Sequence, residues 1–254
     1  MRTHDNTILI TGGGSGIGRA LAEAFHTRGN TVIVTGRRKS QLDAAIAGRT
    51  AMHAVTLDVT DGEAIATFAR QIVKAFPRLN VVINNAGIMR AENLLANPVD
   101  VADAEATVAT NLLGPIRLNA GLLPHLRSQP EAAILNISSG LAFIPRADTP
   151  TYNATKAAVH SYSQSLRFQL RNTSVRVHEL VPPYVQTELM GAQQAVDPRA
   201  MPIADFIEET MSILDTKPYV EEVLVEKVLP LRHAEKGDYP AFFREFNERF
   251  VTSH

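Results

Sequence analysis

The sequence predicts an α/β protein built on a Rossmann-type, doubly wound parallel sheet. Short runs rich in valine and isoleucine alternate with longer segments whose apolar residues recur at helical spacing. The runs are apolar at nearly every position, as expected for strands that helices cover on both faces. The chain has no linker, low-complexity tract or internal repeat, so residues 1–254 are expected to form a single domain.

Seven segments are candidate strands, at residues 7–11, 31–35, 53–57, 81–84, 132–138, 175–181 and 222–225. The clearest helices are expected at residues 16–29, 62–76, 152–171 and 203–214. The last helix lies within residues 188–218, where one glycine and three prolines interrupt the alternation of strands and helices. We expect that segment to be an insertion that covers a substrate at the edge of the sheet.

The composition excludes several classes of protein. Lysine and arginine total 25 against 26 aspartates and glutamates, so the charge gives no argument for nucleic acid as a partner. The absence of cysteine excludes disulfides, zinc–thiolate sites and thiol nucleophiles. The N-terminus lacks a signal-peptide pattern, and no apolar run reaches the ~18 residues of a membrane span. We therefore expect a soluble, cytoplasmic protein that binds neither nucleic acid nor membranes.

A glycine-rich turn follows the first expected strand. Residues 11–18 read Thr-Gly-Gly-Gly-Ser-Gly-Ile-Gly, directly before a helix. Glycines at such a turn allow the backbone to approach a pyrophosphate, which then binds at the helix N-terminus. The spacing G-x-x-x-G-x-G differs from the common G-x-G-x-x-G. A flexible turn that binds nothing is the alternative.

With three later motifs, this turn resembles the short-chain dehydrogenase/reductase family, which has T-G-x-x-x-G-x-G, N-N-A-G and Y-x-x-x-K in this order. Here residues 84–87 read Asn-Asn-Ala-Gly, Ser138 and Ser139 end the fifth strand, and Tyr152 precedes Lys156 by four positions. Y-x-x-x-K alone would arise by chance in about one such chain in eight, but the ordered set is not accidental. Residues 129–134, 139–143 and 181–185 are similar to the DltE-type oxidoreductase subgroup.

The resemblance implies a catalytic set of Asn111, Ser139, Tyr152 and Lys156. Tyr152 and Lys156 share one face of a helix, and a nearby ammonium stabilises a phenolate, so Tyr152 is expected to be the acid/base. Ser139 is preferred to Ser138 because the family places its serine 13 residues before the tyrosine. The resemblance also implies that Asn111 holds a water connecting Lys156 to solvent. A helix-capping amide is the alternative.

The end of the second strand indicates the cofactor. NAD-preferring enzymes usually have an acidic residue there, which binds the ribose 2′-hydroxyl. This chain has Gly36 followed by Arg37 and Arg38, and two guanidinium groups suit a 2′-phosphate. NADP(H) is therefore the expected cofactor, with NAD(H) as the second choice. A solvated basic turn is the alternative.

The resemblance implies a longer set of cofactor contacts, from the glycine turn, the ends of four strands and the catalytic pair. They are Gly12, Ser15, Gly16, Ile17, Gly18, Arg37, Arg38, Asp58, Val59, Asn85, Ala86, Gly87, Tyr152, Lys156, Pro182, Val185 and Thr187. Asp58 could instead cap the helix that begins near Thr60. Pro183 stands where the family has a glycine, which stiffens that loop and removes an N–H group.

The expected reaction is hydride transfer between NADP(H) and a small to medium carbonyl or alcohol substrate. NAD-linked alcohol oxidation at the same site is one alternative, and a dinucleotide-sensing protein without turnover is another. The complete catalytic set argues against a sensor. An uncharged, partly apolar ligand is expected, unless Arg90 or Arg146 points into the pocket, and the lining residues would be Leu141, Phe143, Ile144, Tyr184 and Met190.

The remaining conspicuous residues suggest assembly rather than chemistry. No pair of histidines has metal-ligand spacing beside acidic residues, so no metal is expected. The helix at 152–171 has more apolar surface than one sheet face needs, and the family pairs this helix with the preceding one across a two-fold axis. A homodimer or homotetramer is therefore expected; the apolar residues are Ala157, Ala158, Tyr162, Leu166 and Leu170. A C-terminal stripe of Phe242, Phe243, Phe246 and Phe250 is expected to be core or a subunit contact.

Overall fold

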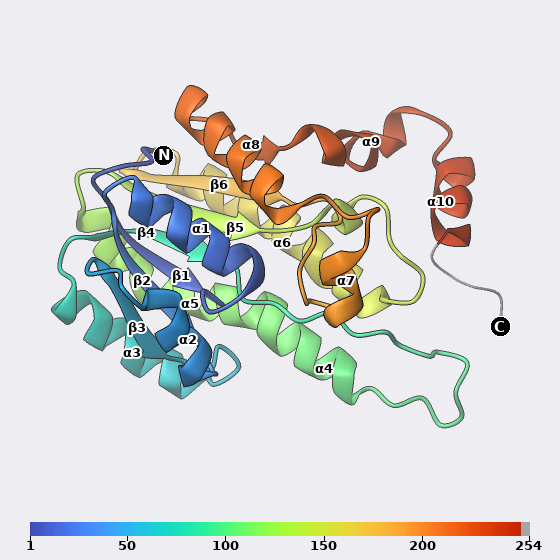
Figure 1. Cartoon of the computed structure of the whole chain (residues 1–254), viewed down its shortest axis with the longest axis horizontal. Coiled ribbons are helices and arrows are strands. Elements are labelled where there is room, and N and C mark those ends of the chain that lie inside the picture. Colours follow the sequence, from blue (N-terminus) through green and yellow to red (C-terminus); the bar gives the residue numbers. More distant parts are fainter. Residues whose placement is uncertain (250–254) are drawn as a thin grey trace.

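The computed structural model describes residues 1–249, and a seven-stranded parallel sheet lies at its centre (Figure 1). The strand order is β3-β2-β1-β4-β5-β6-β7. The strands are β1 (Thr7–Thr11), β2 (Thr31–Gly36), β3 (Met52–Thr56), β4 (Leu79–Asn84), β5 (Ala132–Ile137), β6 (Val175–Val181) and β7 (Glu222–Leu224). Every neighbouring pair is parallel, so the predicted doubly wound sheet is confirmed, including its short last strand.

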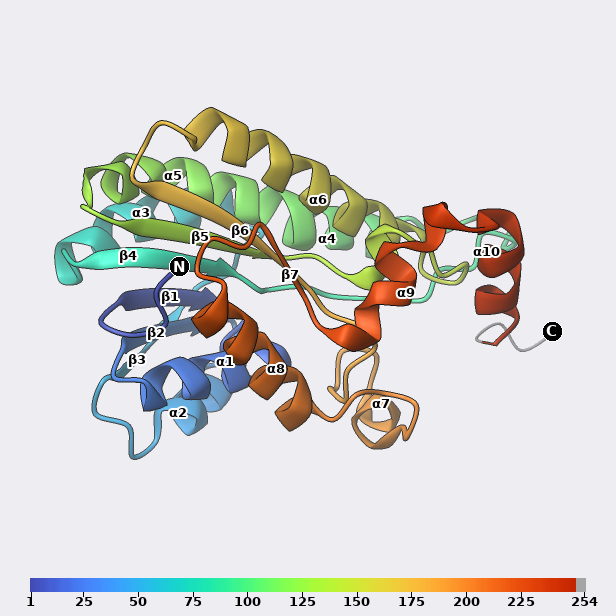
Figure 2. The same cartoon turned by 90° about the horizontal axis from the view of Figure 1, so that it is seen from above.

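Helices cover both faces of the sheet (Figure 2). One face carries α3 (Gly62–Ala75), α4 (Ala102–Val108), α5 (Gly114–Ser128) and α6 (Pro150–Leu170). The other carries α1 (Gly16–Thr27), α2 (Lys39–Ile46) and α8 (Ile203–Thr216). The short α7 (Ala192–Val196), α9 (Leu229–Arg232) and α10 (Tyr239–Glu248) lie beyond the carboxyl ends of the strands.

The burial of β1 explains why its sequence is apolar throughout. Ile8 and Ile10 point into the hydrophobic core between the sheet and α1, whereas Leu9 points into the core on the opposite face. All three side chains are fully buried. A strand between two helical layers therefore needs apolar residues at consecutive positions rather than at alternate ones.

The strand order reverses between β1 and β4, and this switch point positions the functional cleft. β1 pairs with β2 on one side and with β4 on the other. The connections that follow β1 and β4 therefore leave in opposite directions, which opens a crevice at their carboxyl ends. The glycine turn and the Asn-Asn-Ala-Gly segment both lie there.

The expected insertion at residues 188–218 covers the cleft only in its first part. Residues 188–190, Gln194 and Ala195 border the cleft. In contrast, α8 packs beside α1 on the sheet, where its Phe206 and Leu214 are fully buried. The prolines at 202 and 218 correctly mark the two ends of α8. They do not indicate whether the apolar face of α8 packs on the sheet or over the cleft. No helix within residues 1–249 has the length and hydropathy to cross a bilayer.

Candidate active site

A cleft of about 680 Å³ lies at the carboxyl ends of the strands. Its walls come from the β1–α1 turn, the ends of β2 and β4, the turn after β5, the start of α6 and the loop after β6. This volume falls within the range of about 300–1,000 Å³ typical of small-molecule sites. All the predicted cofactor contacts border it except Gly18.

The glycine turn is held tightly against the Asn-Asn-Ala-Gly segment. Gly12 has a φ of +66°, and a Cβ there would lie 2.9 Å from the Cα of Ala86. A Cβ on Gly18 would lie 2.4 Å from the carbonyl oxygen of Gly12, so Gly18 acts through packing below the turn. The hydroxyl of Thr11 accepts hydrogen bonds from the backbone N–H groups of Asn85 (3.1 Å) and Ala86 (3.0 Å).

The N-terminus of α1 faces the cleft beside this turn. Ser15 is the N-cap residue, yet its side chain makes no capping hydrogen bond, and the first turn contains no acidic residue. The N–H groups of a first helical turn have no partner within the helix, and together with the helix dipole they favour an anion. This end of the cleft therefore suits a phosphate group.

Two exposed arginines form the rim beyond β2. The Arg38 guanidinium donates a 3.5 Å hydrogen bond to the hydroxyl of Ser15, and Arg37 borders the same cleft. Burial alone would raise the pKa of Asp58, but hydrogen bonds from Thr60 and the charge of Arg37 lower it. The alternative role of Asp58 as a helix cap is wrong. Asp61 caps α3, while Asp58 accepts the N–H of Thr60 at 2.9 Å.

Tyr152 and Lys156 lie one turn apart on α6, and both side chains are buried at the floor of the cleft. The Lys156 ammonium donates a 2.8 Å hydrogen bond to the carbonyl oxygen of Ile137, and its Nζ lies 5.6 Å from the centre of the Tyr152 ring. Ser139 accepts the backbone N–H of Leu141 at 3.1 Å.

Burial controls the protonation of this pair. It raises the pKa of Tyr152 to about 12, although a hydrogen bond with Ser139 opposes the shift. It lowers the pKa of Lys156 to about 8, against the attraction of the Glu179 carboxylate. Desolvation is the largest effect on the phenol, and the expected stabilisation of a Tyr152 phenolate by Lys156 stays a prediction.

The neighbouring serine points elsewhere. The Ser138 hydroxyl donates a 3.5 Å hydrogen bond to the carbonyl oxygen of Leu180 on β6. Ser139, in contrast, is hydrogen-bonded to Tyr152. Alternation of side chains at the end of β5 separates the two hydroxyls, as the sequence predicts.

Asn111 lies in a π-helical turn, Ala109–Leu113, between α4 and α5. Its side-chain amide accepts the N–H of Ile88 at 2.9 Å and donates to the carbonyl of Ile88 at 2.9 Å. It also donates to the hydroxyl of Thr155 at 3.3 Å. The alternative of a helix-capping amide is therefore wrong. Asn111 and Lys156 border a narrow space that is too small for a water molecule, so the expected water link between Lys156 and solvent stays a prediction.

The loop after β6 closes the cleft. The carbonyl of Pro182 accepts the N–H of Gly140 at 2.9 Å. The hydroxyl of Thr187 accepts a 3.0 Å hydrogen bond from Gln194 on α7, and its methyl group faces Gly16 across the cleft. The side-chain amide of Gln194 on α7 thus holds the loop in place, by donating to Val185 and Thr187. Pro183 has no N–H group and donates no backbone hydrogen bond to the loop.

The expected substrate pocket needs correction. Leu141, Tyr184 and Met190 do line the cleft, but Phe143 and Ile144 do not. The 3-10 turn after β5, Gly140–Ala142, directs both of these side chains away from the cleft, and Ile144 is fully buried. The cleft instead includes Arg90, Arg146 and Phe246. Two arginines thus border the pocket that was expected to take an uncharged ligand, and one phenylalanine of the C-terminal stripe borders the same cleft. Phe250 lies outside the described residues.

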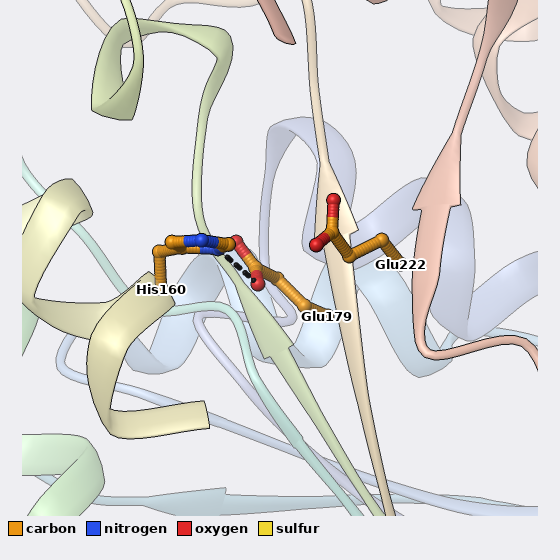
Figure 3. Close-up of side chains that lie close together, drawn as sticks. All are labelled: His160, Glu179 and Glu222. Carbon is orange, nitrogen blue, oxygen red and sulfur yellow. Dashed lines mark hydrogen bonds and ion pairs between the residues drawn. The ribbon is translucent and has the colours of Figure 1, made fainter. Parts of the chain in front are cut away.

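One cluster escaped the sequence analysis. His160, Glu179 and Glu222 come from α6, β6 and β7, and their ligand atoms lie within 4.8 Å of one another (Figure 3). Spacing along the chain cannot reveal a site assembled from three separate elements. The signal along the chain is weak, because Glu179 is one of three charged or titratable residues in β6, with Arg176 and His178.

A Rossmann-type sheet with this glycine turn and a buried tyrosine–lysine pair defines a dinucleotide-binding oxidoreductase fold. Residues 6–197 match the family model described as short chain dehydrogenase. The chain belongs to the short-chain dehydrogenase family.

Its curated relatives match over nearly their whole lengths. The chain is 38% identical over 250 residues to the uncharacterized oxidoreductase DltE of Bacillus subtilis, covering 97% of this chain and 98% of that protein. It is 33% identical over 241 residues to a sulfoacetaldehyde reductase of Chromohalobacter salexigens, covering 89% and 94%. The predicted similarity to DltE-type oxidoreductases is confirmed.

Solved structures of the same fold include complexes with both nicotinamide cofactors. A short chain dehydrogenase from Burkholderia cenocepacia in complex with NADP matches with a TM-score of 0.82 at 25% identity, over 100% of both chains. A short chain dehydrogenase/reductase from Burkholderia phymatum in complex with NAD matches with a TM-score of 0.80 at 22% identity, over 95% and 97%. At 22% identity, the similarity to the Burkholderia phymatum structure supports the fold alone.

Proposed function

We propose that the protein transfers a hydride between NADP(H) and a small to medium carbonyl or alcohol substrate, with Tyr152 as the acid/base. The observation that carries the proposal is a single cleft with a buried set of polar side chains at one end and a helix N-terminus at the other. At one end, Tyr152, Ser139 and Lys156 are buried together. At the other, the uncapped N-terminus of α1 lies beside Arg38.

The cleft fits a dinucleotide cofactor. Gly12 leaves no room for a side chain where the backbone passes Ala86, so the turn presents bare backbone towards the cleft. The pyrophosphate would bind at the N-terminus of α1, and Arg37 and Arg38 would bind a 2′-phosphate. Asp58 and Val59 would contact the adenine, and Thr187 the nicotinamide carboxamide. The cofactor would supply the hydride.

The protein's own residues would manage the proton. Because the pKa of Tyr152 is raised to about 12, its phenol holds its proton at neutral pH and can donate it to a substrate oxygen. Ser139 would bind the same oxygen and orient it towards Tyr152. The Lys156 ammonium stabilises the negative charge that develops on the phenol oxygen. Asn111 would act by holding the backbone of Ile88 beside the cleft, since its amide both accepts from and donates to that residue.

The protonated phenol of Tyr152 is the form that carbonyl reduction requires at neutral pH. The cleft combines the apolar Leu141 and Met190 with the guanidinium groups of Arg90 and Arg146, and Arg146 is ion-paired with Asp148 at 2.6 Å. A carbonyl compound of a few carbons, with or without an acidic group, fits this lining. The sulfoacetaldehyde reductase among its relatives acts, by its name, on an aldehyde of that kind.

The test is NADPH oxidation, followed by absorbance, with a panel of short aldehydes and ketones that includes acidic members. Turnover of at least one compound with NADPH is expected. Alcohol oxidation with NAD alone would favour the NAD-linked alternative. Tight NADPH binding without turnover of any compound would favour a sensor.

Replacing Tyr152 with phenylalanine tests the assigned acid/base. The change removes one hydroxyl and leaves the buried ring, so folding and NADPH affinity should survive. Turnover should fall roughly 10²–10⁴-fold, because the proton donor is lost. Tyr219→Phe, which lies outside the cleft and is 76% exposed, is the matched control and should keep full turnover. Near-normal turnover by the Tyr152→Phe variant would exclude the mechanism.

A further inference from the structure

The cluster of His160, Glu179 and Glu222 lies outside the cleft, on the side of β6 that faces α6 (Figure 3). His160 is one helical turn beyond Lys156 on α6. Its Nδ1 atom and an oxygen of Glu179 are 2.8 Å apart. The Glu222 carboxylate faces this pair from β7.

One carboxylate oxygen of Glu179 is buried without a hydrogen-bond partner among the described residues. The Glu179 side chain is fully buried, and its other oxygen accepts the hydrogen bond from His160. The oxygen without a partner is Oε1. A buried carboxylate with one unsatisfied oxygen is costly, because it has lost its hydration and gained only part of the compensation.

Groups around the cluster hold Glu222 in place. The Arg232 guanidinium donates to both oxygens of Glu222, at 2.6 and 3.0 Å. Arg232 stacks 4.6 Å from the centre of the Phe143 ring, and that ring meets the His160 imidazole edge-on at 4.9 Å. Such outer contacts orient metal ligands in proteins, and each carboxylate oxygen can accept a second partner beside a guanidinium.

We propose that His160, Glu179 and Glu222 bind a divalent transition-metal ion, for which zinc is the best fit. One imidazole nitrogen and two carboxylates are ligands that zinc accepts, at about 2.0–2.2 Å. Ligand atoms around a tetrahedral zinc ion therefore lie about 3.4 Å apart. The His160 and Glu179 ligand atoms are 2.8 Å apart and all the ligand atoms lie within 4.8 Å of one another, so small side-chain movements would suffice.

The bound ion would give Glu179 its second partner. The side chains of His160 and Glu222 are 18% and 19% exposed, which leaves a fourth coordination position open to solvent. Magnesium fits less well, because it prefers six oxygen ligands in octahedral geometry.

Protons should compete with the metal. Zinc requires a neutral imidazole, so binding should release protons and weaken as the pH falls. The charged groups that act on the cluster are the carboxylates themselves and the cations Lys156, Arg167 and Arg232. These cations limit the affinity but leave the direction of the pH dependence unchanged.

The test is calorimetric titration of the full-length protein with zinc chloride alone. One ion per chain should bind, and magnesium chloride should not compete. Glu222→Gln and His160→Gln should each lower the zinc affinity at least about tenfold, since even the loss of an outer-shell partner costs 10–100-fold. Titration in two buffers of different ionisation enthalpy should detect the released protons. Circular dichroism of each variant verifies its folding.

His4→Gln is the matched control. His4 and Asp5 form a histidine–carboxylate pair with the same 2.8 Å separation, but both side chains are exposed, and among residues 1–249 no second carboxylate joins them to complete a set of three ligands. This variant should bind zinc like the wild type. The proposal is wrong if saturable binding is absent, if the His160 and Glu222 variants bind unchanged, or if His4→Gln weakens binding as strongly as they do. None of these outcomes depends on the proposed reductase activity.

Discussion

Arg37 and Arg38 carry the cofactor preference at the scale of single residues. Their positive charges should favour NADPH over NADH by at least tenfold in affinity, about 1.4 kcal/mol. The double variant Arg37→Gln, Arg38→Gln should lose this preference while its NADH affinity stays constant. Fluorescence titration with both cofactors measures the effect. Arg28→Gln, an exposed arginine paired with Asp215 outside the cleft, is the control. Tighter binding of NADH by the wild type would refute the preference and leave the fold unaffected.

Lys156 should set the alkaline limit of activity. Its pKa is lowered to about 8, so its ammonium is present below pH 8 and lost as the pH rises through that value. The phenol of Tyr152 keeps its proton to about pH 12 and cannot cause this loss. The kcat/KM for carbonyl reduction should therefore decline above about pH 8. Lys156→Arg, if active, should shift the decline to higher pH, because a guanidinium does not titrate there. A profile that stays flat to pH 10 would contradict the role of Lys156.

The sequence predicts which residue types border the cleft better than it predicts their electrostatics. The motif spacing selects Tyr152 and Lys156, and both lie in the cleft. Their pKa values depend on how completely the rest of the fold buries them. The spacing of four residues on a helix contains no information about that burial. Phe143 shows the same limit, because a turn of three residues decides whether it faces the cleft or the cluster behind it.

At the scale of the elements, β6 combines an apolar strand with two buried titratable side chains. His178 and Glu179 are consecutive, so they point to opposite faces of the sheet. Burial lowers the pKa of His178 to about 4, and its Nδ1 lies 2.6 Å from the carbonyl of Val220. The sheet therefore folds around a neutral imidazole on one face and a hydrogen-bonded carboxylate on the other.

This arrangement predicts an acid-induced loss of stability. The folded-state pKa of His178 lies below its unfolded value of 6.5, so the unfolded chain binds the proton first as the pH falls. The free energy of unfolding should decrease by about 2 kcal/mol from this group between pH 7 and pH 5. Urea unfolding at several pH values measures it. His178→Asn keeps a side-chain N–H near the same position but does not titrate, so its decrease should be smaller by that amount. Equal decreases in both proteins would show that His178 is not responsible.

Helices differ from strands in how well their packing follows from sequence. The periodicity predicts α8 nearly to its ends, at Ile203–Thr216. Its partner does not follow from periodicity, because an amphipathic helix needs an apolar surface but does not specify which one. In the structure, α8 packs against α1 and the sheet. Within residues 188–218, only α7 and the loop before it therefore border the cleft.

At the scale of the whole molecule, alternation of strands and helices predicts the sheet, its parallel pairing and its switch point. These features follow from local patterns that repeat along the chain. The cluster of His160, Glu179 and Glu222 does not, because it depends on the lateral register of β6 with β7 and on the position of α6 above them. Long-range assemblies of this kind require coordinates.

The predicted assembly rests on less apolar surface than the sequence suggests. Leu166 and Leu170 are buried in the protein's own core, and Tyr162 packs against that core. The outer face of α6 retains Ala157, and near its end Phe168 is 67% exposed. Small and aromatic apolar residues on an exposed helix face are compatible with a two-fold helix pair.

We therefore keep a homodimer or homotetramer as the expectation. Light scattering at micromolar concentration should give at least twice the chain mass of 27.7 kDa. Ala157→Arg places a charge in the centre of the expected interface, where a two-fold axis brings it near its own copy, so it should shift the protein towards the monomer. Val196→Arg, on α7, is the matched control because Val196 is 71% exposed and α7 lies away from α6 (Figure 2). A wild-type mass equal to one chain would refute the assembly. A variant mass unchanged by Ala157→Arg would place the interface on another surface.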